Sequence, residues 1–451
     1  MGAAFSVAKF GGSSMADATA MQRSAKICVA RKTDLIVVSA TYGTTNTIIQ
    51  LCQQASEGKW DTCQPLWQEL VQRHRQIGRD LNASDEQLAL LEGPLNELET
   101  LLKGVNLLRD CSAKIKDSIL GMGERLSSIL FTVAMNKLLP TPNAFCFDVR
   151  TIMATDDRFG AASPIYPIIK ERAKNLLLPQ MNGKVIVTQG YIGRTLEGHN
   201  TTLGRGGSDF SAAILAEAIN AQGLEIWTDV AGIATTDPRV CPKAIPIPEI
   251  SFDEASELAT YGAKIIHPAT LAPARRVGIP VYVGSSYEPE KPGTWIRQKT
   301  ELSPTVRAFA LRKNQVILTI SNPKMVQASG MLAQIFQIFA QYKISIDAIT
   351  TSEISVAMTI NDPSLLNKHL LEELTSLGEL SVEDNISLIG LVGNNLQHTA
   401  GIAKRIFGVL DQINVRMICY GASKHNICIL VQNTDAEKAI QKLHHEFIER
   451  S

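Results

Sequence analysis

The sequence lacks most of the features that mark a metal, membrane or nucleic-acid protein. Its eight cysteines form no C-x-x-C pair and do not cluster with the eight histidines, so no metal-ligand spacing is present. The 44 basic and 44 acidic residues cancel, which leaves no basic surplus for nucleic acid or acidic membranes. No apolar run approaches the roughly 20 residues of a membrane-spanning helix. We therefore expect no metal site built from protein ligands alone, no nucleic-acid partner and no membrane partner.

Two further absences concern location and nucleotide binding. The opening residues MGAAFSVAKF lack the basic region and apolar stretch of a secretion signal, and the scattered cysteines favour reduced thiols, so we expect a cytoplasmic chain. The phosphate-binding pattern G-x-x-x-x-G-K-[ST] does not occur, and GMGERL, residues 121–126, lacks the third glycine of a dinucleotide fingerprint. A nucleotide would have to bind on some other kind of loop.

The chain is long enough for more than one hydrophobic core. Its 451 residues exceed the ~250 to 300 residues at which a single core usually stops growing. Several short apolar runs each precede small or polar residues, which predicts a mostly parallel sheet between helices, with ligands at the carboxyl ends of the strands. These runs are residues 5–10, 35–40, 185–193, 224–229 and 279–286. Leucines at helical spacing over residues 56–107 predict a helical insertion.

The C-terminal third contains an internal repeat. Residues 335–352 align without a gap on residues 406–423, a constant shift of 406 − 335 = 71 positions. Each copy is predicted to form a strand, a glycine-started helix, a strand, a turn and another strand. A polar, proline-terminated stretch at 297–304 precedes the first copy and marks a domain boundary. Two copies of one small β-α-β-β module are therefore expected.

The two copies differ around their turn. Asp347 and Glu353 in the first copy correspond to Ile418 and Lys424 in the second, so only the first copy offers two carboxylates. A carboxylate pair beside a glycine-started helix could hold a ligand that carries an ammonium and a carboxylate group. The alternative is that both acidic residues are solvated turn residues.

Two glycine-rich stretches at strand ends predict an anion site. KFGGSS places Lys9 beside paired glycines, and TTLGRGGSDF places Arg205 among three glycines ahead of a helix whose free amides attract anions. Glycines also make ordinary turns, and Ser208 or Asp209 could simply cap the helix, but a cap does not explain the arginine. The two loops and the lysine supply the positive charge and fixed donors that phosphoryl transfer needs.

Two later motifs are less specific. WTDVAGIATTDPRV contains Asp229 and Asp237, which could serve a nucleotide or metal-phosphate site or could cap turns. YGAKIIHPAT places Lys264 after a Tyr-Gly turn, where a lone lysine is a solvated surface residue more often than a ligand contact. His267 precedes a proline and has no metal-ligand spacing around it, so a structural role is expected.

Six motifs in a fixed order resemble the aspartate kinase family: KFGGSSMAD, GERLS, RFG, TTLGRGGSDFSAA, WTDVAGI with TTDPR, and YGAKIIHPAT. The chain is most similar to the lysine-sensitive, single-function branch, because TTSE stands in the first repeat copy and ICYGAS in the second. The resemblance covers essentially the whole chain. It implies an α/β amino-acid-kinase fold over residues 1–297, followed by two ferredoxin-like ACT modules over 305–386 and 387–451.

The resemblance also implies an activity. The enzyme would use ATP with Mg2+ to phosphorylate the β-carboxylate of L-aspartate, giving 4-phospho-L-aspartate, the first step of lysine, threonine and methionine biosynthesis. L-lysine would inhibit it, and the ACT modules would join a homodimer or a dimer of dimers. A carboxylate nucleophile is already ionised at neutral pH, so no general base is needed and positioning dominates.

Site residues are carried over onto the matching positions. Lys9 would neutralise the transferring phosphoryl group, and Asp209 would orient the lysines or a magnesium ion. Aspartate would be held by Thr45, Glu124, Arg205, Gly206, Gly207 and Ser208. ATP would be held by Lys9, Phe10, Gly11, Gly12, Thr228, Asp229, Ala234, Arg239, Lys264 and Ile265. The inhibitor would lie near Met325, Gly330, Met331, Leu332, Ser345, Asp347, Ser352 and Glu353.

Three positions depart from the family's pattern. Ser13 stands where threonine is common, Ala234 where close relatives have a tyrosine near the nucleotide, and Ala328 where lysine-sensitive relatives have a serine at the inhibitor site. The last two changes predict weaker ATP binding and weaker control by lysine. Two other functions stay open: a sister kinase of the same fold acting on glutamate, acetylglutamate or a nucleotide, and a catalytically silent ACT amino-acid sensor.

Overall fold

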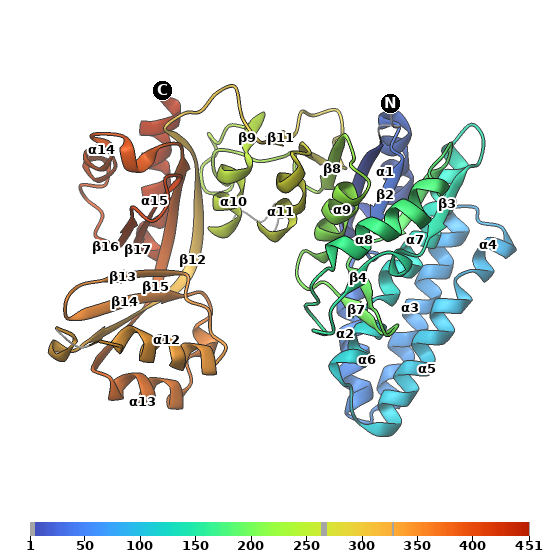
Figure 1. The fold of residues 1–451 in the computed structure, drawn as a ribbon, viewed down its shortest axis with the longest axis horizontal. Coiled ribbons are helices and arrows are strands. Elements are labelled where there is room, and N and C mark those ends of the chain that lie inside the picture. The colour runs from blue at the N-terminus through green and yellow to red at the C-terminus, as the bar shows by residue number, and fades with distance from the viewer. Residues whose placement is uncertain (1–4, 263–267, 327–328, 451) are drawn as a thin grey trace. The chain divides into compact units, whose positions relative to one another are not determined.

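The computed structural model describes residues 5–262, 268–326 and 329–450 (Figure 1). The chain forms two compact units, each built from segments that are discontinuous in sequence. The first unit comprises Met1–Ile233, Ile247–Phe252 and Ile265–Lys299, and the second comprises Ala234–Pro246, Asp253–Lys264 and Thr300–Ser451. Two stretches that precede the polar boundary in sequence therefore belong to the second unit.

The first unit contains an eight-stranded sheet in the order β3-β5-β2-β1-β8-β10-β11-β9. Its strands are β1 (Ser6–Phe10), β2 (Leu35–Val38), β3 (Ala144–Phe147), β5 (Val185–Gln189), β8 (Gly223–Thr228), β9 (Glu249–Ser251), β10 (Val281–Ser285) and β11 (Thr294–Arg297). All neighbours are parallel except β10 and β11, so the predicted mostly parallel sheet is confirmed. Strand β2 is buried along its whole length and β1 along all but its first residue, as expected for strands of a sheet covered on both faces.

Helices and a small second sheet complete this unit. The helices are α1 (Ala18–Arg31), α2 (Thr44–Ser56), α3 (Trp60–Asp80), α4 (Asp85–Ala89), α5 (Glu92–Leu108), α6 (Ala113–Leu120), α7 (Met122–Leu138), α8 (Tyr166–Arg172), α9 (Gly207–Ala218) and α11 (Pro268–Val277). A three-stranded sheet is formed by β4 (Ala154–Thr155), β6 (Ile192–Thr195) and β7 (Asn200–Thr202). The predicted helical insertion corresponds to α3, α4 and α5, and the long helices α3 and α5 lie side by side (Figure 1).

The second unit is built on one six-stranded antiparallel sheet in the order β13-β14-β12-β15-β17-β16. Its elements are α10 (Phe252–Thr260), β12 (Val306–Ser321), α12 (Met331–Gln341), β13 (Ala348–Thr351), β14 (Ser355–Ile360), α13 (Lys368–Ser376), β15 (Glu379–Gly393), α14 (Ile402–Val409), β16 (Val415–Tyr420), β17 (Asn426–Gln432) and α15 (Asn433–His444). This order matches the two repeat copies, each with its glycine-started helix, α12 and α14.

The two copies share their longest strands. The first half of β12 pairs with the second half of β15, from Val306 opposite Gly393 to Arg312 opposite Leu388. The second half of β12 pairs with the first half of β15 and with β14. Because the second half of β15 also pairs with β17, the first half of β12 completes the second copy. The segment that enters the first copy thus supplies a strand to the second.

Both sequence-discontinuous stretches of the second unit pack against its sheet. Phe309 donates its backbone N–H to the carbonyl of Thr235 at 2.7 Å, and the Thr235 hydroxyl lies 2.9 Å from Nε2 of buried His444. In α10, the fully buried Glu254 accepts hydrogen bonds from Arg307 at 3.0 Å and Asn394 at 2.7 Å. None of the helices in the described ranges combines the length and apolar character that a membrane crossing requires.

Candidate active site and effector site

The glycine-rich loops meet at one edge of the large sheet. Phe10 is in register with Val38 and with Trp227, and Thr228 is in register with Ser285, so these parallel strands end together. Lys9 lies on β1 one residue before the strand ends, and Gly11 and Gly12 follow directly. The structure therefore places the expected phosphate loop at the carboxyl edge, where such sheets bind ligands.

Lys9 and Asp209 form a close ion pair at this edge. The Lys9 Nζ lies 2.5 Å from Asp209 Oδ1, and the two side chains are 10% and 16% exposed. Asp209 sits in the first turn of α9, near the positive end of the helix dipole. A side chain at Gly11 would begin 3.6 Å from Lys9 Nζ, so the glycine leaves room around the ammonium group. The two predicted catalytic residues are thus brought together from distant parts of the chain.

The start of α9 is shaped by two glycines with different roles. Gly206, at the N-cap, has φ 68°, a left-handed conformation that favours glycine. A Cβ on Gly207 would lie 2.6 Å from Cδ2 of Tyr191, so the tyrosine ring occupies the space next to it. In the preceding loop, a Cβ on Gly190 would lie 2.6 Å from the Cβ of Ser208. The loop after β5 and the first turn of α9 therefore pack in direct contact, which fixes Ser208 and Asp209.

Glu124 is a buried carboxylate with unused hydrogen-bonding capacity. It lies in the first turn of α7 and is 4% exposed. One oxygen accepts the backbone N–H of Ala40 at 3.3 Å, whereas the buried Oε2 has no partner among the described residues. Burial raises the pKa of Glu124 to about 8, and the positive charge of Lys9 opposes this shift only in part. The site therefore holds a buried carboxyl group with one oxygen, Oε2, that has no hydrogen-bond partner among the described residues.

The remaining predicted aspartate ligands lie on loops and first helical turns. Thr45 is half-buried in the first turn of α2, which follows Gly43 at φ 79°. Arg205 is exposed in the loop before α9, and within the described parts of the chain its guanidinium makes no hydrogen bond or ion pair. A guanidinium without a protein partner is suited to a ligand carboxylate.

The predicted ATP ligands fall into three groups. Gly11, Gly12, Thr228 and Asp229 lie at the carboxyl edge of the first unit, where the Thr228 hydroxyl donates to Asp229 at 3.0 Å. The Phe10 side chain is fully buried and stacks on Trp227, so only its backbone can face a ligand. Ala234 and Arg239 belong to the second unit, and Arg239 pairs there with Asp237 at 2.6 Å. Lys264 and Ile265, like His267, lie outside the described residues.

The predicted inhibitor residues of the first repeat copy lie before and after strand β13, so Asp347 and Glu353 stand at opposite ends of that strand. Gly330 is the N-cap of α12 at φ 95°, and Asp347 immediately precedes β13. The Asp347 carboxylate pairs with Arg312 of β12 at 3.0 Å, a contact that the sequence did not suggest. Glu353 is exposed in the β13–β14 turn, and no contact of its carboxylate is found within the described ranges.

The other predicted inhibitor residues frame the same region. Met325 and Met331 pack against the core of the first copy, while Leu332 is 41% exposed. Ser345 is exposed ahead of β13, and the Ser352 hydroxyl lies 2.7 Å from that of Ser355. Ala328 lies outside the described residues.

Two structurally important polar residues escaped the sequence analysis. Asp117, in the middle of α6, accepts hydrogen bonds at 2.8 Å from the backbone N–H groups of Gly160 and Thr202 and from the Thr202 hydroxyl. It thereby holds the RFG motif against β7. Tyr191 has φ 68° and donates its N–H to Ser211 at 2.9 Å. Only an aspartate on an otherwise apolar helical face, and a tyrosine following a glycine, could have drawn attention to them.

Among the residues that the structure describes, one group of potential metal ligands lies in the second unit, although none was predicted. Ligand atoms of Cys241, His444 and Glu449 lie within 4.8 Å of one another. However, the His444 Nδ1 lies 3.1 Å from Glu449, its Nε2 contacts Thr235, and the ammonium of Lys243 pairs with Glu449 at 2.7 Å. His444 and Glu449 therefore have protein partners without an ion.

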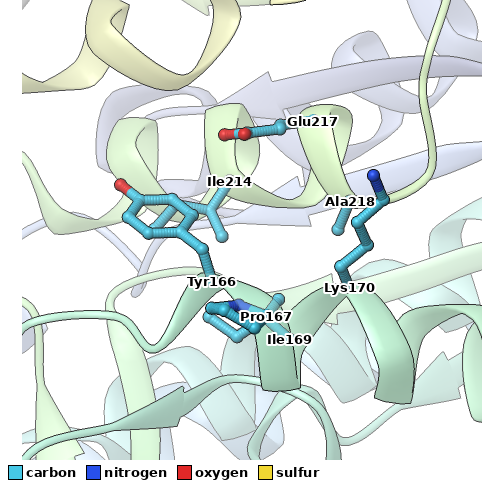
Figure 2. Close-up of a pocket in the computed structure, with 7 residues that line it drawn as sticks. All are labelled: Tyr166, Pro167, Ile169, Lys170, Ile214, Glu217 and Ala218. Carbon is cyan, nitrogen blue, oxygen red and sulfur yellow. The ribbon is translucent and has the colours of Figure 1, made fainter. Parts of the chain in front are cut away.

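A separate cavity of about 340 Å3 lies between α8 and the second half of α9 (Figure 2). Its lining residues are Tyr166, Pro167, Ile169, Lys170, Ile214, Glu217 and Ala218. Arg276 pairs with Glu217 at 2.7 Å and lies 4.1 Å from the centre of the Tyr166 ring. The cavity is lined by the part of α9 farthest along the chain from Asp209, so it does not belong to the Lys9 site.

Comparisons with known proteins agree with this architecture. The amino acid kinase family matches residues 4–285, and the ACT domain matches residues 318–366 and 389–447. The lysine-sensitive aspartokinase 3 of Escherichia coli is 43% identical over 98% of this chain and 99% of its own length. The chloroplastic aspartokinase 1 of Arabidopsis thaliana is 32% identical over 98% of this chain and 80% of its own length.

Two solved structures of E. coli aspartokinase III extend the comparison. The complex with aspartate and ADP (R-state) superposes with a TM-score of 0.85, and the complex with lysine and aspartate (T-state) with 0.83. Both are 43% identical and cover 98% of this chain and 99% of the compared chain. The chain is therefore an amino acid kinase that carries ACT domains. Within that class it belongs to the aspartokinase family.

Proposed function

We propose that this enzyme transfers the γ-phosphoryl group of ATP to the β-carboxylate of L-aspartate, giving 4-phospho-L-aspartate and ADP. The observation that carries the proposal is the carboxyl-edge site itself, in which the Lys9–Asp209 ion pair lies close enough to Glu124 for the lysine charge to act on that carboxylate. This combination offers a cation for the phosphoryl group and an anion for the substrate ammonium.

The geometry supports a separate role for each site residue in the reaction. A β-carboxylate oxygen attacks the γ-phosphorus, the bond to the ADP oxygen breaks, and ADP leaves with the electron pair. Lys9 offsets the negative charge on the phosphoryl oxygens, and Asp209 holds the Lys9 ammonium in place. Glu124 takes the α-ammonium group and Arg205 a carboxylate. Further contacts with aspartate are proposed for Thr45, Gly206, Gly207 and Ser208. Because no proton must be removed from the nucleophile, orientation supplies most of the rate enhancement.

The donor set at the carboxyl edge fits a magnesium ion that arrives with the nucleotide. Mg2+ prefers oxygen ligands and is usually held by one or two carboxylates together with substrate phosphates. Asp209 is a carboxylate at the phosphate side of the site and would hold such an ion in addition to orienting Lys9. When bound, the ion neutralises phosphate charge. Contacts with ATP are also proposed for Gly11, Gly12, Thr228, Asp229, Ala234, Arg239, Lys264 and Ile265.

Regulation is proposed to reside in the repeat. We assign residues 1–297 to the catalytic domain and 305–386 and 387–451 to the two ACT modules, with L-lysine bound at the turn of the first module. Support comes from Glu353, whose carboxylate is exposed, and from Asp347, which has no acidic counterpart in the second copy. The enzyme is proposed to be cytoplasmic, to act as a homodimer or a dimer of dimers, and to begin lysine, threonine and methionine synthesis.

The test is a substrate and effector panel. ADP release is measured with ATP, with and without Mg2+, and with L-aspartate, L-glutamate or N-acetylglutamate as acceptor, and lysine and threonine are titrated in parallel. Turnover with aspartate that requires Mg2+ and is lowered by lysine supports the proposal. Preference for another acceptor would identify a sister kinase. Lysine binding without turnover on any acceptor would identify an amino-acid sensor.

A further inference from the structure

We propose that Arg312 transmits ligand binding at the proposed lysine site. Its guanidinium competes with the ligand for Asp347 and also links the first ACT copy to the end of helix α10. This inference rests on the proposed lysine site and adds the side chain through which binding is transmitted. It concerns contacts within the second unit only.

One guanidinium bridges two acceptors. The Arg312 Nη1 lies 3.0 Å from Asp347 Oδ2, and the two side chains are 23% and 18% exposed. The Arg312 Nη2 donates to the backbone carbonyl of Thr260, the last residue of α10. A planar guanidinium can direct separate N–H groups to two acceptors at fixed angles, so a shift at either acceptor is felt at the other.

The chain around Thr260 is packed against the same region. A Cβ on Gly262, which has φ 103°, would lie 3.7 Å from the Cβ of Arg312. The Tyr261 ring covers Gly390 of β15, where a Cβ would lie 2.6 Å from the ring. The segment that follows α10 is thus seated on β12 and β15, beside Arg312.

Helix α10 itself is fixed to the second copy. Glu257 accepts hydrogen bonds from Ser423 at 2.7 Å and from Asn426 at 2.6 Å, and buried Glu254 contacts Arg307 and Asn394. The Arg312 bridge then joins the last residue of this anchored helix to Asp347 of the first copy. Movement between the two copies would therefore be transmitted to the end of α10.

A ligand ammonium and Arg312 compete for one carboxylate. Asp347 already holds a guanidinium, and two cations on a single carboxylate repel each other, so binding of an amino acid weakens the Arg312 contact. The Thr260 hydrogen bond changes with it. Thr260 immediately precedes the motif YGAKIIHPAT, whose Lys264 is proposed to contact ATP. Occupancy at Asp347 thereby acts, through one side chain, on the residue that precedes this motif in the sequence.

The second copy carries the reverse arrangement and supplies a control. With the shift of 71 positions, Arg312 corresponds to Glu383 and Asp347 to Ile418. Glu383 pairs with Arg416 at 2.5 Å, with exposures of 32% and 35%. Breaking this pair removes an ion pair of similar exposure from the same sheet without touching Asp347.

The experiment separates binding from inhibition. For wild type, Arg312→Met, Arg312→Lys and Arg416→Met, calorimetry gives the Kd for L-lysine, and ADP release gives the fraction of each enzyme's own rate that remains at saturating lysine. Arg312→Met should bind lysine about two- to fivefold more tightly, because a competing cation is gone, yet retain more than half of its rate. Arg312→Lys should bind like wild type but also retain more rate, because one ammonium does not reproduce the fork. Arg416→Met should match wild type in both quantities.

Two results would overturn the inference. If wild type binds lysine and Arg312→Met and Arg312→Lys are inhibited as completely as wild type with unchanged Kd, Arg312 carries no coupling, while the proposed lysine site stands. If lysine neither binds to nor inhibits wild type, the proposed lysine site fails and the inference fails with it. Thermal melts of each variant verify folding, and Arg312→Lys retains the charge if the methionine variant does not fold.

Discussion

The Lys9 ammonium and the Asp209 carboxylate, which are 200 positions apart in sequence (209 − 9), lie 2.5 Å from each other at the carboxyl edge of the sheet. The contact joins the end of β1 to the first turn of α9. Both side chains are largely buried, so replacing either one would leave the other as an unpaired buried charge. Each residue should therefore be tested together with its partner.

Replacing Lys9 by methionine should lower kcat for ADP release by at least ~10³-fold, since the positive charge facing the phosphoryl group is lost. Asp209→Asn should lower kcat as well, and the double variant should lose less than the sum of the two single losses, because the residues act as one unit. Steady-state kinetics with aspartate measure all three.

The matched control is Lys26→Met, which removes a lysine from the exposed side of α1. That variant should turn over like wild type. A kcat for Lys9→Met within tenfold of wild type would show that the lysine does not face the reacting phosphate.

The affinity for aspartate should depend on pH through Glu124. Because its pKa is about 8, the Glu124 carboxyl group is largely protonated near neutral pH when no substrate is bound. A substrate ammonium requires the carboxylate form. The KM for aspartate should therefore fall as pH rises toward about 8 and level off above it. Glu124→Gln should raise KM and remove this dependence. A wild-type KM that is constant between about pH 6 and 8 would contradict the assignment.

The same carboxyl predicts how stability changes with pH. In the unfolded chain Glu124 ionises near its ordinary pKa of 4.5, but in the folded protein its pKa is about 8. Between these values the folded state binds the extra proton, so the free energy of unfolding falls as pH rises. A glutamine at position 124 does not titrate, so Glu124→Gln lacks this contribution to the pH dependence of stability. Its melting temperature relative to wild type should therefore be higher at about pH 8 than at about pH 5, and an equal difference at both would refute the burial argument.

A methyl group at Gly207 should displace the Tyr191 ring, because the Cβ would lie 2.6 Å from Cδ2. Gly207→Ala is expected to lower the free energy of unfolding by about 1 to 3 kcal/mol, the usual cost of overpacking. It should also raise the KM for aspartate, since the first turn of α9 shifts. Urea unfolding and steady-state kinetics measure the two effects.

A second substitution at Tyr191 tests whether a steric clash is the cause of the stability lost in Gly207→Ala. Tyr191→Gly in the Gly207→Ala background removes the ring and also relieves the left-handed backbone at this position, φ 68°. Part of the lost stability should return. Gly104→Ala on α5, where a Cβ would meet no atom within 4 Å, is the control and should not lower the stability.

Asp347→Asn tests the inhibitor site directly. The substitution keeps the size of the side chain but removes the charge that a lysine ammonium requires, so the Kd for lysine should rise at least ~10-fold. Calorimetry measures it. Ile418→Asn, the corresponding change in the second copy, should leave the Kd as in wild type. Equal binding by wild type and Asp347→Asn would place the ligand elsewhere.

The sequence predicted the parts of the fold that depend on local patterns. Apolar runs followed by glycine or polar residues correspond to β1, β2, β8 and β10, and the parallel register brings their ends together. The run at residues 185–193, however, forms two strands, β5 and β6, in different sheets. Gly190 and Tyr191 turn the chain between them, and the turn depends on contacts with α9 that no local pattern reveals.

Contacts between distant segments were the part that the sequence could not supply. The repeat predicted both copies, but not that the first half of β12 pairs with the second half of β15. The Arg312–Asp347 pair depends on the strand order β13-β14-β12 within the first copy, and the resemblance pointed to Asp347 without naming its partner. Likewise, Glu124 was expected to bind an ammonium, but its depth of burial and raised pKa depend on the packing of α7 against Ala40.

The shared strands have a consequence for synthesis on the ribosome. Residues 306–312 emerge early but have their partners in the second half of β15, and the Thr235 and α10 stretches emerge earlier still, with partners as late as Asn394, Asn426 and His444. These segments must remain without their partners while the first copy folds. If the ribosome stalled before β17, the nearly complete chain would have an unpaired edge on β15. The acidic residue of α10 that binds the side chain of Asn426 in β17 would lack that partner. Chaperones and proteases would be expected to act on the nascent chain at that stage.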